Sequence, residues 1–155
     1  MKLRLVIILL AMVAMVSCGK KASEETADES AAEEPMEEES MMSGVYFVDL
    51  EDGAVVSSPV IVNMGVSGME IEPAGAVNEG KGHHHIIIDG TFMPAGETIP
   101  ADETHIHYGK GQTADTLDLA PGQHTITLQF ANGVHASFGE EWSKTISVTV
   151  EGGEL

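Results

Sequence analysis

Short runs of β-branched and aromatic residues, separated by turn signals, dominate the sequence from residue 44 onward. Apolar residues in these runs do not recur at the three- and four-residue spacing of an amphipathic helix. We therefore expect strands at 45–50, 60–66, 83–88, 104–108, 123–130 and 143–150. Strands of this length and spacing predict an all-β domain over residues 44–155, an antiparallel immunoglobulin-like β-sandwich of about seven strands.

Alternation along each predicted strand assigns its residues to two faces. The more apolar set of each strand is expected to face the core: His84, Ile86 and Ile88; Ile106 and Tyr108; His124, Ile126, Leu128 and Phe130; Ile146, Val148 and Val150. The sets expected to face away include four histidines: His83, His85, His105 and His107. Asp89-Gly90 and Asn132-Gly133 are the strongest hairpin signals, and the second should begin a hairpin or loop that carries His135.

The first 17 residues have the character of a secretory signal. Lys2 and Arg4 precede an apolar run over 5–16, which is shorter than a typical transmembrane helix. The run ends in Met-Val-Ser-Cys, which resembles a bacterial lipobox with Cys18 as the lipid-modified residue, although Leu is usual where Met15 stands. We expect a signal peptide over 1–17 and a lipid-anchored protein of the bacterial cell envelope. An ordinary secretory signal with an unrelated cysteine is the alternative.

Residues 18–43 are expected to form a disordered acidic tether, because they contain no aromatic or β-branched aliphatic residue with which to build a core. An export signal is the minor alternative for this segment. The whole chain has a formal net charge of −18. Such acidity argues against nucleic acid as a partner, since phosphate binding needs a positive surface. The lipid anchor would make the membrane the first partner, and an envelope protein could be a second.

All seven histidines lie between residues 83 and 135, and two groups of them contain a His-x-His pair. On a strand this spacing places two imidazoles on one face, about 7 Å apart along the chain. Neutral imidazole is the commonest metal ligand and suits zinc, copper and nickel. We expect His83, His85, His105 and His107 to be the principal ligands of a transition metal, with His124 and His135 as further ligands or as groups that orient a ligand.

Copper is favoured over zinc as the cofactor, because the domain lacks the cysteines of a thiolate zinc site and contains three methionines. Hydrogen-bonded surface histidines or a ligand pocket are the alternatives for the His-x-His pairs. His124 fits a core histidine that anchors the Pro121-Gly122 turn equally well, His84 fits a structural role, and His135 has no local support. Protons should displace the metal below about pH 6, because a protonated imidazole cannot ligate.

Several enzyme templates do not fit the chain. Residues 109–113 lack the spacing of a phosphate loop, and no hydrolase or zinc-protease motif occurs. The segment 105–109 is weakly similar to the copper-ligand strand of copper-zinc superoxide dismutases, but the only arginine in the chain is Arg4. A negative domain would also repel superoxide. The chain is therefore expected to be no enzyme.

Four blocks in order resemble a known family: residues 83–89, residues 105–113, residues 121–130 and His135. They are similar to the bacterial domain-of-unknown-function 4399 family over about residues 44–150. The resemblance implies an exported, often lipid-anchored protein without an established activity. The sequence thus predicts metal buffering, delivery or sensing in the envelope. A metal-free binding or assembly module is the first alternative, and an enzyme with a histidine-bound metal and an open coordination position is the second.

Overall fold

The computed structural model describes residues 43–152. The predicted signal peptide, Cys18 and the tether lie outside the described residues. The described part contains nine strands: β1 (Gly44–Phe47), β2 (Ala54–Ser57), β3 (Val60–Ser67), β4 (Glu70–Ile71), β5 (Lys81–Ile88), β6 (His105–His107), β7 (Ala114–Leu117), β8 (Gly122–Ala131) and β9 (Ser143–Glu151). A single 3₁₀ turn, Glu140–Trp142, precedes β9. Within residues 43–152 there is no helix with the length and apolar character needed to cross a bilayer.

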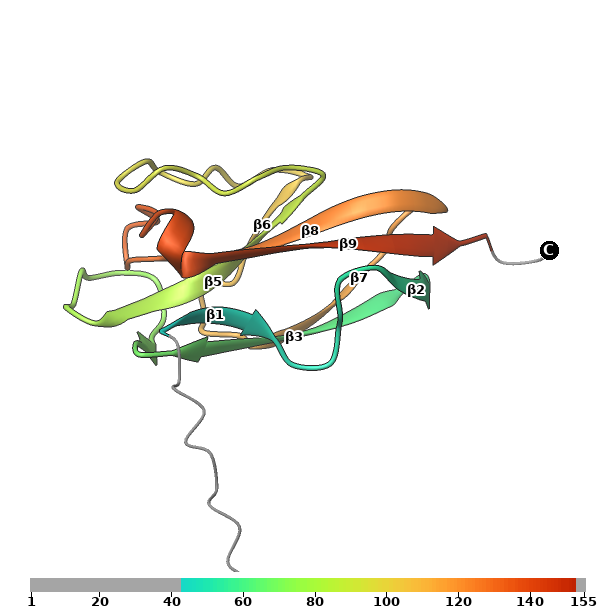
Figure 1. The fold of residues 1–155 in the computed structure, drawn as a ribbon. Coiled ribbons are helices and arrows are strands. Elements are labelled where there is room, and N and C mark those ends of the chain that lie inside the picture. Colours follow the sequence, from blue (N-terminus) through green and yellow to red (C-terminus); the bar gives the residue numbers. More distant parts are fainter. Residues whose placement is uncertain (1–42, 153–155) are drawn as a thin grey trace, which may run out of the picture. The chain divides into compact units, whose positions relative to one another are not determined.

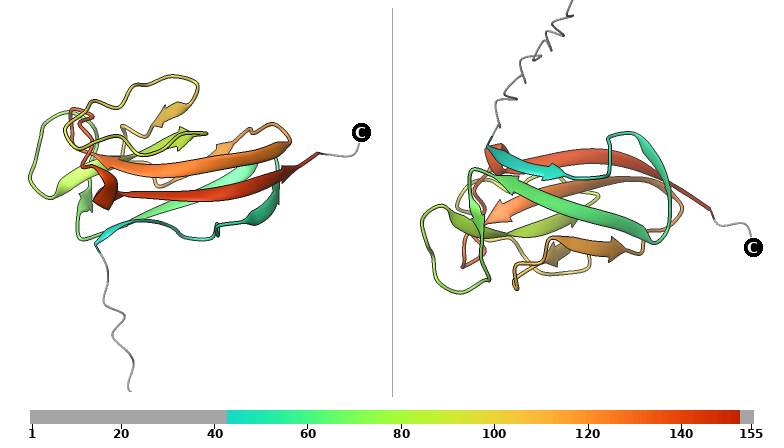
Figure 2. Two further views of the ribbon diagram at one scale, coloured as in Figure 1. Left: turned by 45° about the horizontal axis from the view of Figure 1, so that its top comes forward. Right: turned by 90° about the horizontal axis from the view of Figure 1, so that it is seen from below.

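The strands form two sheets that pack face to face, which confirms the predicted all-β, sandwich-like domain (Figure 1). The smaller sheet has the order β1-β3-β7, and the larger has the order β2-β9-β8-β5-β4, with β6 also paired to β5. Most neighbours are antiparallel, whereas β2–β9 and β4–β5 are parallel. Figure 2 shows the long strands β8 and β9 running side by side across the larger sheet.

Three of the strands, β2, β4 and β7, were not among the predicted runs. β4 has only two residues, and β7 reads Ala-Asp-Thr-Leu, so neither shows a recognisable β-branched alternation. β2 is a four-residue strand at the edge of the larger sheet. These short edge strands are recruited by hydrogen bonding to a longer neighbour, which local sequence does not encode.

The core lies between the sheets and follows the predicted alternation. Ile126, Leu128 and Phe130 of β8 are fully buried there. The apolar set of β9 joins them as expected, and the smaller sheet contributes the buried side chains of Val60, Val62 and Met64. Tyr108 also reaches this core, which confirms the predicted orientation of the segment around β6.

The outer face of the larger sheet is covered as well. The connection 89–104 between β5 and β6 lies over it, coloured yellow-green to yellow in Figure 1. As a result Thr127 and Gln129, which point away from the core, are completely buried. The Gln129 side chain accepts a hydrogen bond from Met93 N at 3.0 Å and donates to Gly139 O at 3.0 Å and Trp142 O at 3.1 Å. This amide therefore holds two segments against the sheet: the connection 89–104 through Met93, and the turn before β9 through Gly139 and Trp142.

The two predicted turn signals have different outcomes. Asn132-Gly133 begins a loop that carries His135, as expected, and the Asn132 side chain accepts hydrogen bonds from Val134 N and Ala136 N, both at 3.0 Å. Asp89-Gly90 does not close a two-residue hairpin, since the next strand begins only at His105. Asp89 does adopt a positive φ of 54°, but its backbone N–H bonds to Thr125 O, which keeps the chain alongside β8.

Candidate metal centre

Three structural elements place histidines on the covered outer face of the larger sheet. β5 presents His83 and His85, which alternation directs to the same side. β6 pairs with β5 in a register that sets His107 directly opposite His85. The loop after β8 adds His135, whose positive φ of 67° turns the chain back toward the sheet. Strand alternation, cross-strand register and one loop thus bring four imidazoles together.

The four rings lie in mutual contact. The ring centroids of His83 are 4.9 Å from His85, 5.0 Å from His107 and 5.2 Å from His135. The His107 and His135 centroids are 4.5 Å apart, and the His85 ring stacks on His107 at 5.0 Å. We call His83, His85, His107 and His135 the histidine cluster.

Nitrogen atoms of the cluster are close enough to share one ion. One potential ligand atom from each of His83, His107 and His135 lies within 4.8 Å of the other two. His85 joins them through its Nε2, which is 3.1 Å from Nε2 of His83. Nitrogens bound tetrahedrally to an ion at about 2.0–2.1 Å are separated by about 3.4 Å. The His83–His85 pair is already near this spacing, and the separations among the ligand atoms of His83, His107 and His135 would have to shrink by about 1.4 Å at most.

The cluster contains polar atoms that the protein leaves unsatisfied. His83 and His85 are 0% and 1% exposed. The buried atoms Nδ1 of His83, Nδ1 of His85, Nε2 of His107 and Nε2 of His135 have no hydrogen-bond partner among the described residues. Buried polar groups are nearly always hydrogen-bonded, because each unpaired one costs about 1–3 kcal/mol. A cation bound between the rings would satisfy one nitrogen of each ring that ligates it.

Burial also favours the neutral form of three cluster imidazoles, those of His83, His85 and His107. Burial, together with repulsion from His107 and His135, lowers the pKa of His83 to about 4. Burial and the neighbouring histidines lower the pKa of His85 to about 3, and burial also lowers the pKa of His107. A neutral imidazole keeps a nitrogen lone pair, which a metal ligand requires. Near pH 7 these rings therefore have the protonation state that metal binding needs.

Two glycines allow the chain to approach the cluster closely. A Cβ at Gly109 would collide with the His107 ring, and a Cβ at Gly133 would collide with the carbonyl oxygen of Ala76. Gly75 N also donates to Gly133 O at 2.7 Å, which holds the His135 loop against the segment before β5. Gly109 and Gly133 thus position the His107 ring and the His135 loop without touching the nitrogens themselves.

His105 does not join the cluster, although it was a predicted principal ligand. On β6, His105 lies opposite Ile87 of β5, and its Nδ1 donates to Asp102 Oδ1 at 2.8 Å. Asp102 also accepts hydrogen bonds from Thr104 N and His105 N, both at 2.9 Å, and the His105 bond holds the pKa of this carboxyl well below its usual range. The His105 ring therefore has a carboxylate partner of its own at the rim of the covered face.

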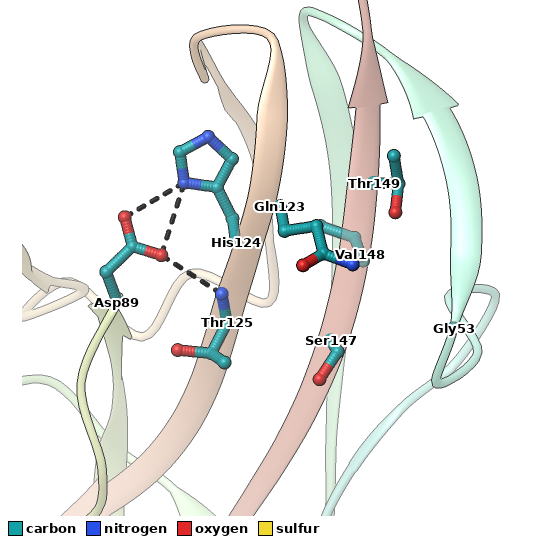
Figure 3. Close-up of a pocket in the computed structure, with 8 residues that line it drawn as sticks. All are labelled: Gly53, Asp89, Gln123, His124, Thr125, Ser147, Val148 and Thr149. Atoms are coloured by element: carbon teal, nitrogen blue, oxygen red, sulfur yellow. Dashed lines mark hydrogen bonds and ion pairs between the residues drawn. The ribbon is translucent and has the colours of Figure 1, made fainter.

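His124 lies apart from the cluster, five residues before Gln129 on β8, or roughly 17 Å along the strand. Its Nδ1 is 2.9 Å from Asp89 Oδ2 (Figure 3), and its Nε2 is 2.9 Å from the carbonyl oxygen of Ala120. Both oxygens can only accept, so both nitrogens donate and the ring is an imidazolium. The hydrogen bond to Asp89 accordingly raises the pKa of His124. In this state it has no lone pair to offer a metal.

His124 and Asp89 line a shallow hollow of about 530 Å³ on the larger sheet. Figure 3 shows the hydroxyl-bearing side chains Thr125, Ser147 and Thr149 along β8 and β9 beside the pair. The histidine cluster is not part of this hollow. The pair fixes the start of β8 to the end of β5, in keeping with the turn-anchoring alternative for His124.

His84 points to the opposite face from the cluster, as predicted. Its ring packs against Phe130 with centroids 5.1 Å apart, and the residue is fully buried. Neither ring nitrogen has a hydrogen-bond partner among the described residues, and burial lowers the pKa of His84 to about 4. His84 is a structural core residue with an unsatisfied polar edge.

The structure thus unites three of the predicted principal ligands with His135, which was predicted as a secondary one. Sequence reasoning missed Gln129 and the close approach of Gly109 to the His107 ring. Gln129 carried one recognisable signal, since it is a long polar residue on the outward face of the predicted strand 123–130. The assignment of His135 depends on how the loop folds back, for which the sequence contains no periodic signal.

Comparison with known proteins agrees with the expected family. Residues 62–151 match the family described as Domain of unknown function (DUF4399). The match runs from β3 into β9 and includes all four members of the histidine cluster. No curated protein and no solved structure matches this chain. Because more than half of the chain is covered, the protein belongs to the DUF4399 family.

Proposed function

We propose that this protein is a lipid-anchored protein of the bacterial cell envelope that binds a transition metal, with copper favoured over zinc, for buffering, delivery or sensing. The observation that carries the proposal is the histidine cluster, in which four buried ring nitrogens lack a hydrogen-bond partner among the described residues. A metal ion accepts the lone pairs of neutral imidazoles and so removes the cost of burying them.

The donor set favours copper. The cluster offers imidazole nitrogen alone, and the only cysteine of the chain is Cys18 at the predicted lipidation site. Divalent copper generally binds nitrogen ligands more tightly than divalent zinc does. Structural zinc sites, in addition, usually contain thiolates. The strongly acidic chain would also draw cations toward the protein at low ionic strength.

A binding role is favoured over catalysis. His85 lies beside the group of His83, His107 and His135, so that a fourth imidazole can complete a tetrahedral site. A closed four-ligand site leaves no position for a substrate, whereas three histidines and a water would leave one. Spectroscopy of the cobalt-substituted protein distinguishes the two, since a bound water exchanges with added azide and a fourth imidazole does not.

The metal-free alternative has one observation in its favour. The 3.1 Å contact between Nε2 of His83 and Nε2 of His85 is a hydrogen bond when one ring donates and the other accepts. The histidines of the cluster could then be structural residues without metal, packed beneath the covering loops of an envelope assembly module. This alternative leaves the buried Nε2 atoms of His107 and His135 without a partner, which is why we rank it second.

Metal titration of the purified full chain tests the proposal. We expect one ion to bind more tightly than about 10 μM and to raise the unfolding temperature. A variant with His83, His85, His107 and His135 replaced by alanine should lose both effects, while His124→Ala, the matched control outside the cluster, should keep them. Weaker binding by the wild type, or equal binding by the fourfold variant, would falsify the metal assignment.

The proposed lipid anchor at Cys18 has a separate test. Changing Cys18 to Ala should abolish incorporation of labelled fatty acid and release the processed protein from the membrane fraction. Membrane association that persists without fatty-acid labelling would contradict the lipid anchor, and it would leave the metal site unaffected.

A further inference from the structure

The histidine cluster contains no negative charge to balance a bound cation. Its four potential ligands are imidazoles, which are neutral when they ligate. Among the described residues, the group of side chains close enough to share an ion here consists of His83, His107 and His135, and it includes no Asp or Glu. Two carboxylates that flank the cluster strands, Asp89 and Asp102, are engaged by His124 and His105.

Two of the four rings, those of His83 and His85, are also shielded from water, which would otherwise stabilise the charge of an ion, while His107 and His135 are partly exposed. His83 and His85 are almost completely buried under the connection 89–104 and the His135 loop. The polar groups beneath these segments are already used, since Gln129 bonds to Met93, Gly139 and Trp142. A cation held here would keep its charge in a medium of low polarity, where an uncompensated ion is costly.

This electrostatic setting discriminates between ions by their charge. The Born cost of moving an ion out of water scales with the square of its charge, so that a divalent ion pays about four times the cost of a monovalent ion of equal size. Imidazole suits copper, and monovalent copper is the transition-metal ion with the lowest charge that such ligands bind. We propose that the histidine cluster selects monovalent copper, Cu(I), over Cu(II) and Zn(II).

The geometry is compatible with this choice. One potential ligand atom from each of three rings lies within 4.8 Å of the others, and those rings come from β5, β6 and the His135 loop. Cu(I) has a filled d shell, as Zn(II) has, and therefore imposes no geometry through its d electrons. Three imidazoles suffice for it, and His85 remains within reach through its 3.1 Å contact with His83.

This inference rests on the proposed function and can fail separately from it. Affinities of the purified full chain would be measured by competition with chelators, anaerobically for Cu(I) and separately for Cu(II) and Zn(II). We expect Cu(I) to bind at least about 100-fold more tightly than either divalent ion, which for copper corresponds to a reduction potential raised by about 120 mV. No binding of any ion overturns both proposals, and equal or tighter binding of Cu(II) or Zn(II) overturns only the charge selectivity.

A matched pair of variants tests the cause of the selectivity. His135 has a positive φ of 67°, a conformation that Asp and Asn accept more readily than most residues. His135→Asp adds one negative charge to the cluster, and His135→Asn is the neutral control of nearly the same shape. We expect the ratio of Cu(I) to Cu(II) affinity to be at least about tenfold lower in the Asp variant than in the Asn variant. Equal ratios would show that charge does not set the preference.

An exogenous anion is the competing way to balance a divalent ion. Chloride or azide would then accompany Cu(II) into the cluster, and the Cu(II) affinity would rise in proportion to the anion concentration. Such a dependence in the wild-type chain overturns the monovalent assignment even when the two variants differ. A Cu(II) affinity that does not change with chloride or azide supports the assignment, and it needs only the wild-type protein.

Discussion

Histidines occur in two contrasting settings in this domain. His105 and His124 each donate a hydrogen bond to a partly exposed carboxylate, at 2.8 Å to Asp102 and at 2.9 Å to Asp89. The four rings of the histidine cluster have no carboxylate partner, and most of their buried nitrogens bond to nothing among the described residues. One residue type therefore serves two purposes, depending on whether the protein satisfies its nitrogens. The hydrogen bond to Asp89 favours the protonated form of His124, whereas burial keeps His83 and His85 neutral and able to bind a metal.

The sharpest test of this contrast compares two histidines on the same short strand. His107→Ala removes a ring from the cluster and should weaken metal binding by at least about 100-fold, or about 2.7 kcal/mol. His105→Ala removes the ring paired with Asp102 and should change the affinity by less than about threefold. Competition titration against a chelator measures both.

Circular dichroism of the two β6 variants controls for folding. A loss of affinity in His105→Ala as large as that in His107→Ala would make His105 a ligand, as the sequence alone predicted. Its Nε2 would then be the ligand atom, because the bond to Asp102 occupies only Nδ1.

Acidification should destabilise the metal-free chain through the buried rings. The pKa values of His83 and His84 are lowered to about 4 in the folded protein, against about 6.5 in an unfolded chain. The unfolded state then binds more protons below pH 6.5, so stability is complete above this value and falls as the pH decreases toward 4. Urea unfolding in the presence of a chelator measures the effect. A free energy of unfolding that stays constant between pH 7 and 4.5 would contradict the burial of neutral rings.

Much of the fold could be predicted because its long strands obey simple alternation. The inward sets of β8 and β9 were assigned correctly, since one face of each packs against the other sheet. The buried outer face was not predicted, because Thr127 and Gln129 look like exposed residues until the connection 89–104 folds over them. Tertiary covering by a long loop has no periodic signature in the sequence.

Only part of the candidate site could be predicted, because alternation places residues on a face but does not say which strands and loops meet there. His-x-His spacing correctly placed His83 and His85 on one face. Their alignment with His107 depends on the β5–β6 register, and the contribution of His135 depends on a loop held by Asn132. His105 has the spacing expected of a ligand, but the structure pairs its Nδ1 with Asp102, and the spacing alone does not reveal this contact.

His84 allows the cost of an unsatisfied imidazole to be measured away from the cluster. Both of its ring nitrogens are buried without a partner among the described residues, and its ring packs against Phe130. His84→Leu replaces these polar atoms with an apolar side chain of similar size and should raise the free energy of unfolding by about 1–2 kcal/mol. Metal affinity should remain within about threefold, because the side chain points to the other face. Destabilisation by this substitution would show that the His84 ring makes a stabilising polar interaction.

The smallest expected effect concerns the His124–Asp89 pair, where the sign is opposite to that of the buried rings. The hydrogen bond to Asp89 raises the pKa of His124, so folding favours its protonated form. The stabilisation is complete below the unfolded value of about 6.5 and is lost as the pH rises through the folded value. Because the pair is partly exposed, its coupling should not exceed about 1 kcal/mol. A double-mutant cycle with His124→Gln and Asp89→Asn at about pH 5.5 and 8.5 measures it, and a coupling that grows with pH would show that a neutral His124 makes the contact.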